Sequence, residues 1–440
     1  MWSLSPSTRS VAMLWRSRRA FQHAMMLAMV VAGVFYLESR HVSSNTPSPP
    51  AAGEAVPVTA RRPADGCKSL SIPLAQRVRC IELILERNGI DPSTLGAAAG
   101  LVPSGDLLDR ARLLAHATGD ARQGVLCAVF MTPTPENFAT LKANIELQAA
   151  AESGGGTCDW AVVAYGAANA DAARAALEEL TSSAQRKRGV KVVYFDSPPP
   201  LRQLLAAHGH EDISFTPSTT YYPKPLLYLQ LARLLASYEY VWLLDDDISL
   251  EGSQLPVALQ ALRCAFSPSP PALVGQLLIT GGRQSYSYLN SDGWTQRRIV
   301  AAKSRFIELQ APLVDTGFFL WFLQAVVVPM MPAIAYFESD FGMDNVWCGA
   351  AGAYARQRLQ YAAAYAPCNV VVAGQSIRHL DRGSSRAGLG RKMLKKKFLR
   401  DHQLILLFHK KFADWFVFGH TNSLNNFTSS AVSTNATCAT

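Results

Sequence analysis

Three successive carboxylates, Asp245 to Asp247, follow the apolar segment Tyr240 to Leu244. Such a segment predicts a buried strand, on which residues two apart point to the same side. Asp245 and Asp247 should therefore converge, while Asp246 points to the other side, where we assign it to substrate binding. Carboxylates packed this closely repel one another, and a divalent cation relieves that cost. We expect Asp245 and Asp247 to bind Mn²⁺ or Mg²⁺, with water and substrate phosphates as further ligands, rather than to form a surface turn or helix N-cap.

A second acidic cluster, Phe337 to Asp344, precedes a predicted helix. Glu338, Asp340 and Asp344 are candidates for a general base or for binding an acceptor hydroxyl. Asp344 could equally be the N-cap of that helix.

Two further side chains are candidates for the same site. His379 follows the last predicted strand, and we expect it to be a third metal ligand, against the alternative of a structural histidine. Lys224 opens the helix before the aspartate strand, and it could bind a phosphate or be an ordinary surface lysine.

An alternation of strands and helices positions these residues. The predicted strands are Val125 to Met131, Trp160 to Tyr165, Val190 to Phe195 and Tyr240 to Leu244, and the predicted helices are Pro135 to Ala151, Asn169 to Ala184 and Pro223 to Ser237. This alternation predicts an α/β fold with a mostly parallel, Rossmann-like sheet flanked by helices. In such sheets ligands bind at the carboxyl ends of the strands.

The second half of the chain is less regular. Strand-like runs occur in Ala272 to Thr280 and Phe306 to Phe322, a helix is predicted for Asp344 to Gln357, and a last buried strand for Asn369 to Ala373.

Ala20 to Leu37 is an 18-residue segment without a formal charge. As a helix it would span about 27 Å, close to the roughly 30 Å hydrocarbon core of a bilayer. Four arginines precede it, whereas Glu38 and Arg40 nearly cancel after it, so the positive-inside rule leaves the N-terminus in the cytosol. We expect a single-pass type II protein anchored in the Golgi or another secretory-pathway membrane, with a lumenal C-terminal domain. A cleaved signal peptide and a cytosolic or organelle-targeted chain are the alternatives.

Two other features agree with a lumenal location. Asn426-Phe-Thr428 and Asn435-Ala-Thr437 are glycosylation sequons. The chain also has eight cysteines, an even number that is compatible with disulfides in an oxidising compartment, although Cys127 and Cys264 lie in apolar runs and could be buried free thiols.

The net charge of +9 does not by itself indicate a nucleic-acid partner. No groove-reading or base-stacking motif accompanies the basic residues, so we expect no nucleic-acid binding. Some of these cations could instead face an anionic substrate such as a nucleotide diphosphate.

The acidic motifs resemble those of a plant and algal family of unknown function, whose members are often labelled lysine-ketoglutarate-reductase trans-splicing related. Its Asp-x-Asp signature reads here as Tyr238-Glu-Tyr-Val-Trp-Leu-Leu-Asp-Asp-Asp247, after Lys224, and its Gly-Met-Asp motif as Asp340-Phe-Gly-Met-Asp344. Further matches are Gly275-Gln276-Leu277, Val314-Asp315-Thr316 and Ile377-Arg-His379, and the resemblance covers about residues 220 to 382. The chain departs from the family pattern at Phe341, Asp340 and Asp315, which puts the acceptor pocket in doubt.

The family as a whole is similar to glycosyltransferases of the GT-A fold. The resemblance implies that Asp245, Asp247 and His379 hold Mn²⁺ against the diphosphate of a nucleotide sugar. We assign the glycan acceptor to Asp344, Asp340 and Glu338, and further substrate contacts to the motif residues Gln276 and Asp315.

On this basis we divide the chain into seven parts. They are a cytosolic tail (1–19), a transmembrane signal-anchor (20–37), a flexible stem (38–66), a helical stem region (67–118) with helices at Leu74 to Asn88 and Asp106 to Ala117, a GT-A-like catalytic domain (119–390), a basic C-terminal helix (391–420) and a disordered, glycosylated tail (421–440).

Two alternatives belong to other functional classes. One is a catalytically silent Golgi protein that binds glycans or scaffolds enzymes. The other is a phosphatase of the haloacid-dehalogenase type, because an apolar strand followed by Asp-x-Asp also describes the nucleophile loop of that superfamily. That nucleophile normally lies on the first strand of its domain, and here three βα units precede Asp245.

Overall fold

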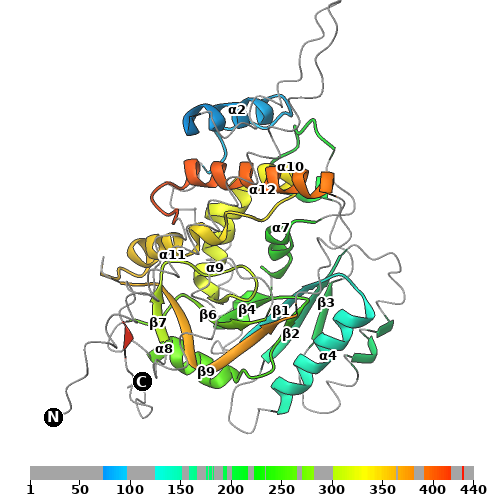
Figure 1. The fold of residues 1–440 in the computed structure, drawn as a ribbon, viewed down its shortest axis with the longest axis vertical. Helices are drawn as coiled ribbons and strands as arrows, with labels where there is room; N and C mark the ends of the chain where they lie inside the picture. The colour runs from blue at the N-terminus through cyan, green and yellow to red at the C-terminus, as the bar shows by residue number, and fades with distance from the viewer. Residues whose placement is uncertain are drawn as a thin grey trace, which may run out of the picture. The chain divides into compact units, whose positions relative to one another are not determined.

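A mixed β-sheet lies at the centre of an α/β fold (Figure 1). The computed structural model describes residues 73–96, 124–150, 158–165, 192–195, 201–216, 222–264 except 233, 270–281, 301–380 except 363 and 364, 391–417 and 429–430, and six residues between 175 and 182. The predicted membrane anchor, the flexible stem, the helix Asp106 to Ala117 and both glycosylation sequons lie outside these residues. The described residues all belong to one unit, Pro63–Thr440.

The described part of the sheet contains ten strands. They are β1 (Val125–Met131), β2 (Cys158–Ala164), β3 (Val192–Phe195), β4 (Tyr240–Asp245), β5 (Ile248–Ser249), β6 (Val274–Thr280), β7 (Ala301–Ser304), β8 (Leu313–Asp315), β9 (Cys368–His379) and β10 (Ser429–Ser430). Their order is β10-β7-β9-β6-β8-β4-β1-β2-β3, and β5 pairs with β9. The first four predicted strands are confirmed, with β1 at its predicted bounds.

The direction of the strands corrects one prediction. β3, β2, β1 and β4 are parallel neighbours, but β8 is antiparallel to both β4 and β6, and β9 is antiparallel to β7 and β5. The sheet is therefore mixed rather than mostly parallel. The prediction rested on the alternation of strands and helices in the first half of the chain, whose strands β1 to β4 are parallel neighbours, whereas the less regular second half contributes the antiparallel strands.

Each face of the sheet is covered by an apolar cluster. On β1, Leu126, Ala128 and Phe130 belong to one cluster, and Cys127 and Val129 belong to the other. This alternation is that of a strand buried on both faces.

Helices complete the two outer layers (Figure 1). One face carries α4 (Pro135–Ala150) and α8 (Leu255–Cys264), and the other carries α7 (Lys224–Tyr228), α9 (Thr316–Phe322) and α11 (Asp344–Arg358). We call the second one the α11 face. The predicted helices at Pro135 and Asp344 are confirmed, whereas the one predicted for Pro223 to Ser237 is broken into α7 and two 3₁₀ turns, Leu229–Leu231 and Leu235–Ser237.

The helical segment Thr316–Phe337 was not predicted. It consists of α9, a π-helical stretch at Leu323–Val327 and α10 (Val328–Phe337). Within the described residues it is the one helix long and apolar enough to cross a membrane, but 83% of its apolar window is buried in the fold, as in a core helix. Every residue of α9 is buried, so its sequence lacks an amphipathic period. The strand-like run predicted within Phe306 to Phe322 is confirmed at β8, whereas Thr316–Phe322 is helical.

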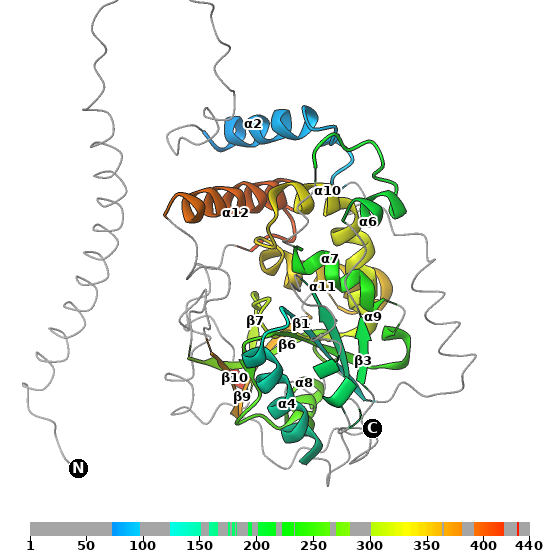
Figure 2. The ribbon, with the colours of Figure 1, turned by 90° about the vertical axis from the view of Figure 1, so that its right-hand side faces the viewer.

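A further helical layer lies over the α11 face. The basic helix α12 (Arg391–Lys411) packs between α10 and α2 (Leu74–Glu86), which both views display (Figures 1 and 2). Lys410 Nζ donates to Glu82 Oε1 at 2.6 Å, which joins α12 to α2. A shorter helix, α6 (Leu201–Ala207), contacts α10.

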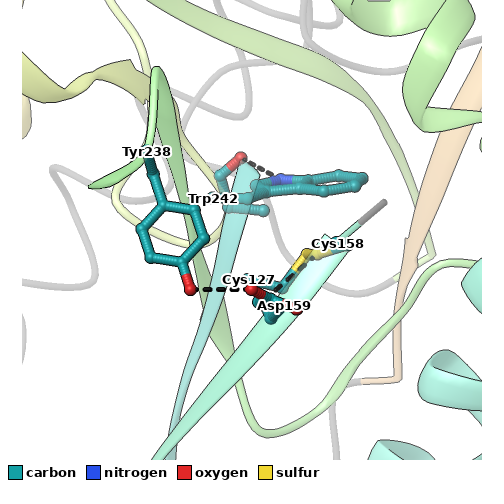
Figure 3. Close-up of a disulfide and its surroundings, with 6 residues drawn as sticks. Cys127, Cys158, Asp159, Tyr238 and Trp242 are labelled. Carbon is teal, nitrogen blue, oxygen red and sulfur yellow. Dashed lines mark hydrogen bonds between the residues drawn. A yellow bond between two sulfur atoms is a disulfide. The ribbon is translucent and has the colours of Figure 1, made fainter. Parts of the chain in front are cut away.

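Disulfides fix two parts of this framework. Cys127–Cys158 joins β1 to β2 beside Trp242 (Figure 3), and Cys348–Cys368 joins α11 to β9. Cys264 is disulfide-bonded as well, so neither it nor Cys127 is a free thiol. The disulfides agree with the even number of cysteines.

Candidate active site

The aspartate run lies where the order of the parallel strands reverses. β2 lies on one side of β1 and β4 on the other, and Asp245, the last residue of β4, is opposite Phe130 near the end of β1. The carboxyl ends of strands at such a reversal border a crevice that binds ligands in open α/β sheets. The fold therefore presents these carboxylates at the position where a ligand is expected.

Asp246 faces the loop between β1 and α4. Its Oδ2 accepts hydrogen bonds from the backbone N–H of Thr132 at 3.1 Å and from Nδ2 of Asn137 at 2.7 Å. Burial raises the pKa of Asp246 to about 6, and the hydrogen bond from Thr132 opposes that rise. Asp246 therefore joins β4 to the β1–α4 loop, on a different side from the partners of Asp245 and Asp247.

Asp247 meets His379. The short strand β5 pairs with the end of β9, where Ile248 is opposite His379, and the carbonyl of Asp247 accepts a hydrogen bond from Leu380 at 2.9 Å. This pairing brings His379 Nε2 within 3.2 Å of Asp247 Oδ2. Asn144 of α4 fixes β5 from the other side, because it donates to Ile248 O and accepts from the backbone N–H of Leu250, each at 2.8 Å.

Asp245 forms an ion pair with Lys224. The ammonium of Lys224 contacts Asp245 Oδ1 and donates to the carbonyl of Leu309 at 2.6 Å. Burial raises the pKa of Asp245, and Lys224 opposes this effect. Lys224 thus neutralises a carboxylate of the site in this structure and is not the exposed surface lysine that the sequence also allowed.

Two acids from the second cluster reach the same region. Asp344 is the first residue of α11 and not its N-cap, which is Met343. Burial, followed by the charges of Glu308 and Asp340, raises the pKa of Asp344 to about 7. The charge of Asp340 also raises the pKa of Asp245. Asp340 therefore lies within electrostatic range of both acids and links the two predicted clusters.

The turn that carries Asp340 is held by α12. Glu338 has a left-handed backbone, with φ of 48°, and its carboxylate pairs with Arg400. Next to it the buried Ser339 donates its hydroxyl to the buried carboxylate of Asp401 at 2.7 Å. Glu338 therefore contacts α12, whereas we had predicted that it acts on the acceptor.

Gly342 completes this turn. Its φ of 97° favours glycine, and a Cβ there would lie 3.2 Å from Cα of Ile405 on α12. The turn that places Asp340 and Asp344 is thus built directly against the α12 backbone.

The two remaining predicted substrate residues differ in position. Gln276 is buried on β6, and its Oε1 accepts a hydrogen bond from the backbone N–H of Glu308 at 2.8 Å. This bond positions Glu308, whose charge raises the pKa of Asp344. Asp315 is opposite Tyr240, at the amino end of β4, and accepts from the N–H of Phe318 at 2.8 Å as the N-cap of α9. The structure does not bring Asp315 to the site.

Sequence reasoning missed several contributors. Asn137 and Thr132 donate hydrogen bonds to Asp246. The charge of Glu308 raises the pKa of Asp344. Tyr165 and Tyr228 lie within electrostatic range of Asp245. One signal was available, because Tyr228 lies four residues after Lys224 and therefore on the same face of a helix. The others depend on contacts between distant segments.

The donor set suits a divalent cation in its chemistry. The site holds four carboxylates, those of Asp245, Asp247, Asp340 and Asp344. The ammonium of Lys224 pairs with Asp245 and the imidazole of His379 contacts Asp247, so carboxylates are in excess. Carboxylate oxygen and imidazole nitrogen are ligands of Mn²⁺, and oxygen is the preferred ligand of Mg²⁺. Within the described residues no three His, Cys, Asp or Glu side chains are arranged to hold a metal ion, and Asp245 contacts Lys224.

No protein-family model matches the chain, and a search of curated proteins finds no relative.

Proposed function

We propose that this protein is a metal-dependent glycosyltransferase of the GT-A type, which transfers a sugar from a nucleotide-sugar donor to a glycan or another acceptor in the secretory pathway. The observation that carries the proposal is the contact of Asp247 with His379 beside Asp245, at the carboxyl ends of the strands where the strand order reverses. Asp340, from a separate segment, lies within electrostatic range of both Asp245 and Asp344.

We propose the following roles for the residues that bind the donor and the metal. Asp245, Asp247 and His379 would hold Mn²⁺ or Mg²⁺, which when bound supplies positive charge that offsets the charge of a leaving diphosphate. Lys224, which contacts Asp245 in this structure, would bind a phosphate oxygen of the donor.

The second acidic cluster would act on the acceptor. Asp344, with a pKa of about 7, is suited to accept a proton from an acceptor hydroxyl near neutral pH. Asp340 would orient that hydroxyl or share the role. The β1–α4 loop, fixed to Asp246 by Thr132 and Asn137, would lie beside the nucleotide.

A second candidate is a catalytically silent glycan-binding protein. It is favoured by one observation, the ion pair of Lys224 with Asp245, because a lysine already neutralises one of the predicted metal ligands.

The test is hydrolysis of a panel of UDP- and GDP-sugars by the purified full chain, with Mn²⁺ and with EDTA. The variant with Asp245→Ala and Asp247→Ala should lose at least 100-fold in rate, whereas Glu251→Ala, which removes an exposed carboxylate nearby, should not. Equal rates in the double variant and the wild type would exclude the catalytic role. Nucleotide-sugar binding without hydrolysis and without a metal effect would favour the silent protein.

A further inference from the structure

A buried tyrosine hydroxyl at the candidate site has no hydrogen-bond partner among the residues that the structure describes. Tyr228, the last residue of α7, has no exposed surface, and within the described residues its hydroxyl has no partner. A buried hydroxyl without a partner costs free energy, so such groups are rare unless a ligand or water completes them.

The ring of Tyr228 is held in place. It packs edge-on against Phe130, at 5.1 Å between ring centroids, and against Phe319 at 5.5 Å. Phe130 belongs to β1 and Phe319 to α9, so both walls are core elements of the α11 face. The hydroxyl cannot readily turn away to find another partner.

The hydroxyl lies within electrostatic range of the acids of the site. Lys224, one helical turn earlier on the same side of α7, places its ammonium on Asp245. The carboxylates of Asp245, Asp340 and Asp344 all act on the Tyr228 hydroxyl electrostatically. Burial, with these charges, raises its pKa well above the ordinary value, so the group stays a neutral donor.

We propose that the Tyr228 hydroxyl is a substrate-binding group that donates a hydrogen bond to an oxygen of the nucleotide-sugar donor. This inference rests on the proposed function and deepens it, since it adds a neutral donor to the cation Lys224 on the same helix face. The accepting oxygen belongs either to the diphosphate or to the sugar, and both are hydrogen-bond acceptors of the same kind.

The test replaces Tyr228 by phenylalanine, which removes only the hydroxyl. Urea unfolding of the full chain should give a midpoint that is unchanged or higher, because the lost group has no partner in the free protein. Calorimetry with Mn²⁺ should give a Kd roughly 3- to 30-fold weaker for the nucleotide sugar that the wild type hydrolyses fastest. Weakening of its nucleoside diphosphate to the same degree assigns the bond to a phosphate, and weakening of the nucleotide sugar alone assigns it to the sugar.

Tyr238→Phe is the matched control. Its hydroxyl donates to Asp159 Oδ2 at 2.8 Å, near the amino end of β4 (Figure 3), far along the strand from Asp245. This variant should lower the unfolding midpoint and leave the Kd unchanged, the opposite of Tyr228→Phe.

Three outcomes would overturn the inference. A lower unfolding midpoint in Tyr228→Phe would mean that the hydroxyl already has a partner, whatever the activity is. Equal Kd values in an active wild type and in Tyr228→Phe would reject the role of Tyr228 and leave the proposed function intact. A wild type that neither binds nor hydrolyses any nucleotide sugar would reject the proposed function, and with it the ligand.

Discussion

His379 Nε2 lies 3.2 Å from Asp247 Oδ2, although the two residues are far apart in the sequence. The contact depends on β5, a strand of two residues that turns back from the aspartate run and pairs with the end of β9. An acid and an imidazole in contact at the carboxyl end of a sheet are a pair of potential metal ligands. A structural ion pair would show the same contact between His379 and Asp247. The two interpretations are distinguished by whether this pair binds a metal ion.

His379→Ala should weaken the binding of Mn²⁺ by roughly tenfold or more, because it removes one of three proposed ligands. Calorimetric titration of the purified full chain with MnCl₂ measures this change. His208→Ala, a change to a histidine on the turn after α6, should leave Mn²⁺ affinity unaltered. If His379→Ala binds Mn²⁺ as tightly as the wild type does, His379 is not a ligand.

Lys224→Met should make the fold depend on metal. The substitution leaves Asp245 without its counter-charge, and we expect the free energy of unfolding to fall by about 1 to 3 kcal/mol without metal. Mn²⁺ should then raise the melting temperature of Lys224→Met more than that of the wild type, because the cation replaces the lost ammonium. Differential scanning calorimetry with MnCl₂ and with EDTA measures both effects. An equal Mn²⁺-induced rise in the melting temperature of the two proteins would show that the Lys224 ammonium does not occupy a metal site.

Local patterns were sufficient to predict the elements around Asp245. The bounds of β1 and the start of α4 follow from a short apolar run and from Pro135 at a helix start. The alternation that put Asp245 and Asp247 on one side of a strand did not anticipate the turn at Asp246 and Asp247, because strand β4 ends at Asp245.

The partners of these residues could not be predicted in the same way. The contact of His379 with Asp247 requires β5 to pair with β9, and the hydrogen bond from Thr132 to Asp246 requires the β1–α4 loop to lie beside the end of β4. Both are contacts between distant segments that leave no periodic trace in the sequence. Asp315 illustrates the reverse case, because its resemblance to a family motif gave a substrate role while its position makes it the cap of α9.

Asp344→Asn should stabilise the protein in a pH-dependent way. Burial and neighbouring acids raise the pKa of Asp344 from 3.8 to about 7, so the folded state binds this proton more tightly than the unfolded state does. The stability that proton binding supplies is complete below pH 4 and is lost as pH rises through 7. Asn is neutral throughout and keeps the oxygen that accepts from the N–H of Asn345, so the variant should exceed the wild type by about 4 kcal/mol at pH 8 and by little at pH 4.

Urea unfolding at pH 4, 6 and 8 measures this difference. Glu251→Gln, which changes an exposed carboxylate, should give a flat difference over the same range. In the wild type, kcat/KM should rise with pH and level off above 7 if Asp344 is the general base. A stability difference for Asp344→Asn that does not grow between pH 4 and 8 would contradict the raised pKa.

Asp401 should control the acidic turn from outside the site. Its buried carboxylate accepts a hydrogen bond from the hydroxyl of Ser339, the residue before Asp340. The Glu338–Arg400 pair and the packing of Gly342 also position this turn. Asp401→Ala leaves the Ser339 hydroxyl buried without its acceptor, so the free energy of unfolding should fall by about 1 to 3 kcal/mol. Hydrogen exchange at 338–343 should accelerate while exchange in β1 and β4 stays slow, because the loss is local.

A double-mutant cycle separates this specific contact from a general weakening of α12. If Ser339 and Asp401 act through their hydrogen bond, Ser339→Ala and Asp401→Ala together should cost less than the sum of the single changes, with a coupling energy of about 1 kcal/mol. Asp340 then loses its fixed position in either single variant, and kcat for nucleotide-sugar transfer should fall. The Kd of the nucleoside diphosphate should stay near that of the wild type, since the β1–α4 loop is fixed by its hydrogen bonds to Asp246. Additive stability losses, or a Kd that weakens in step with kcat, would mean that α12 supports the whole domain and not the turn that carries Asp340.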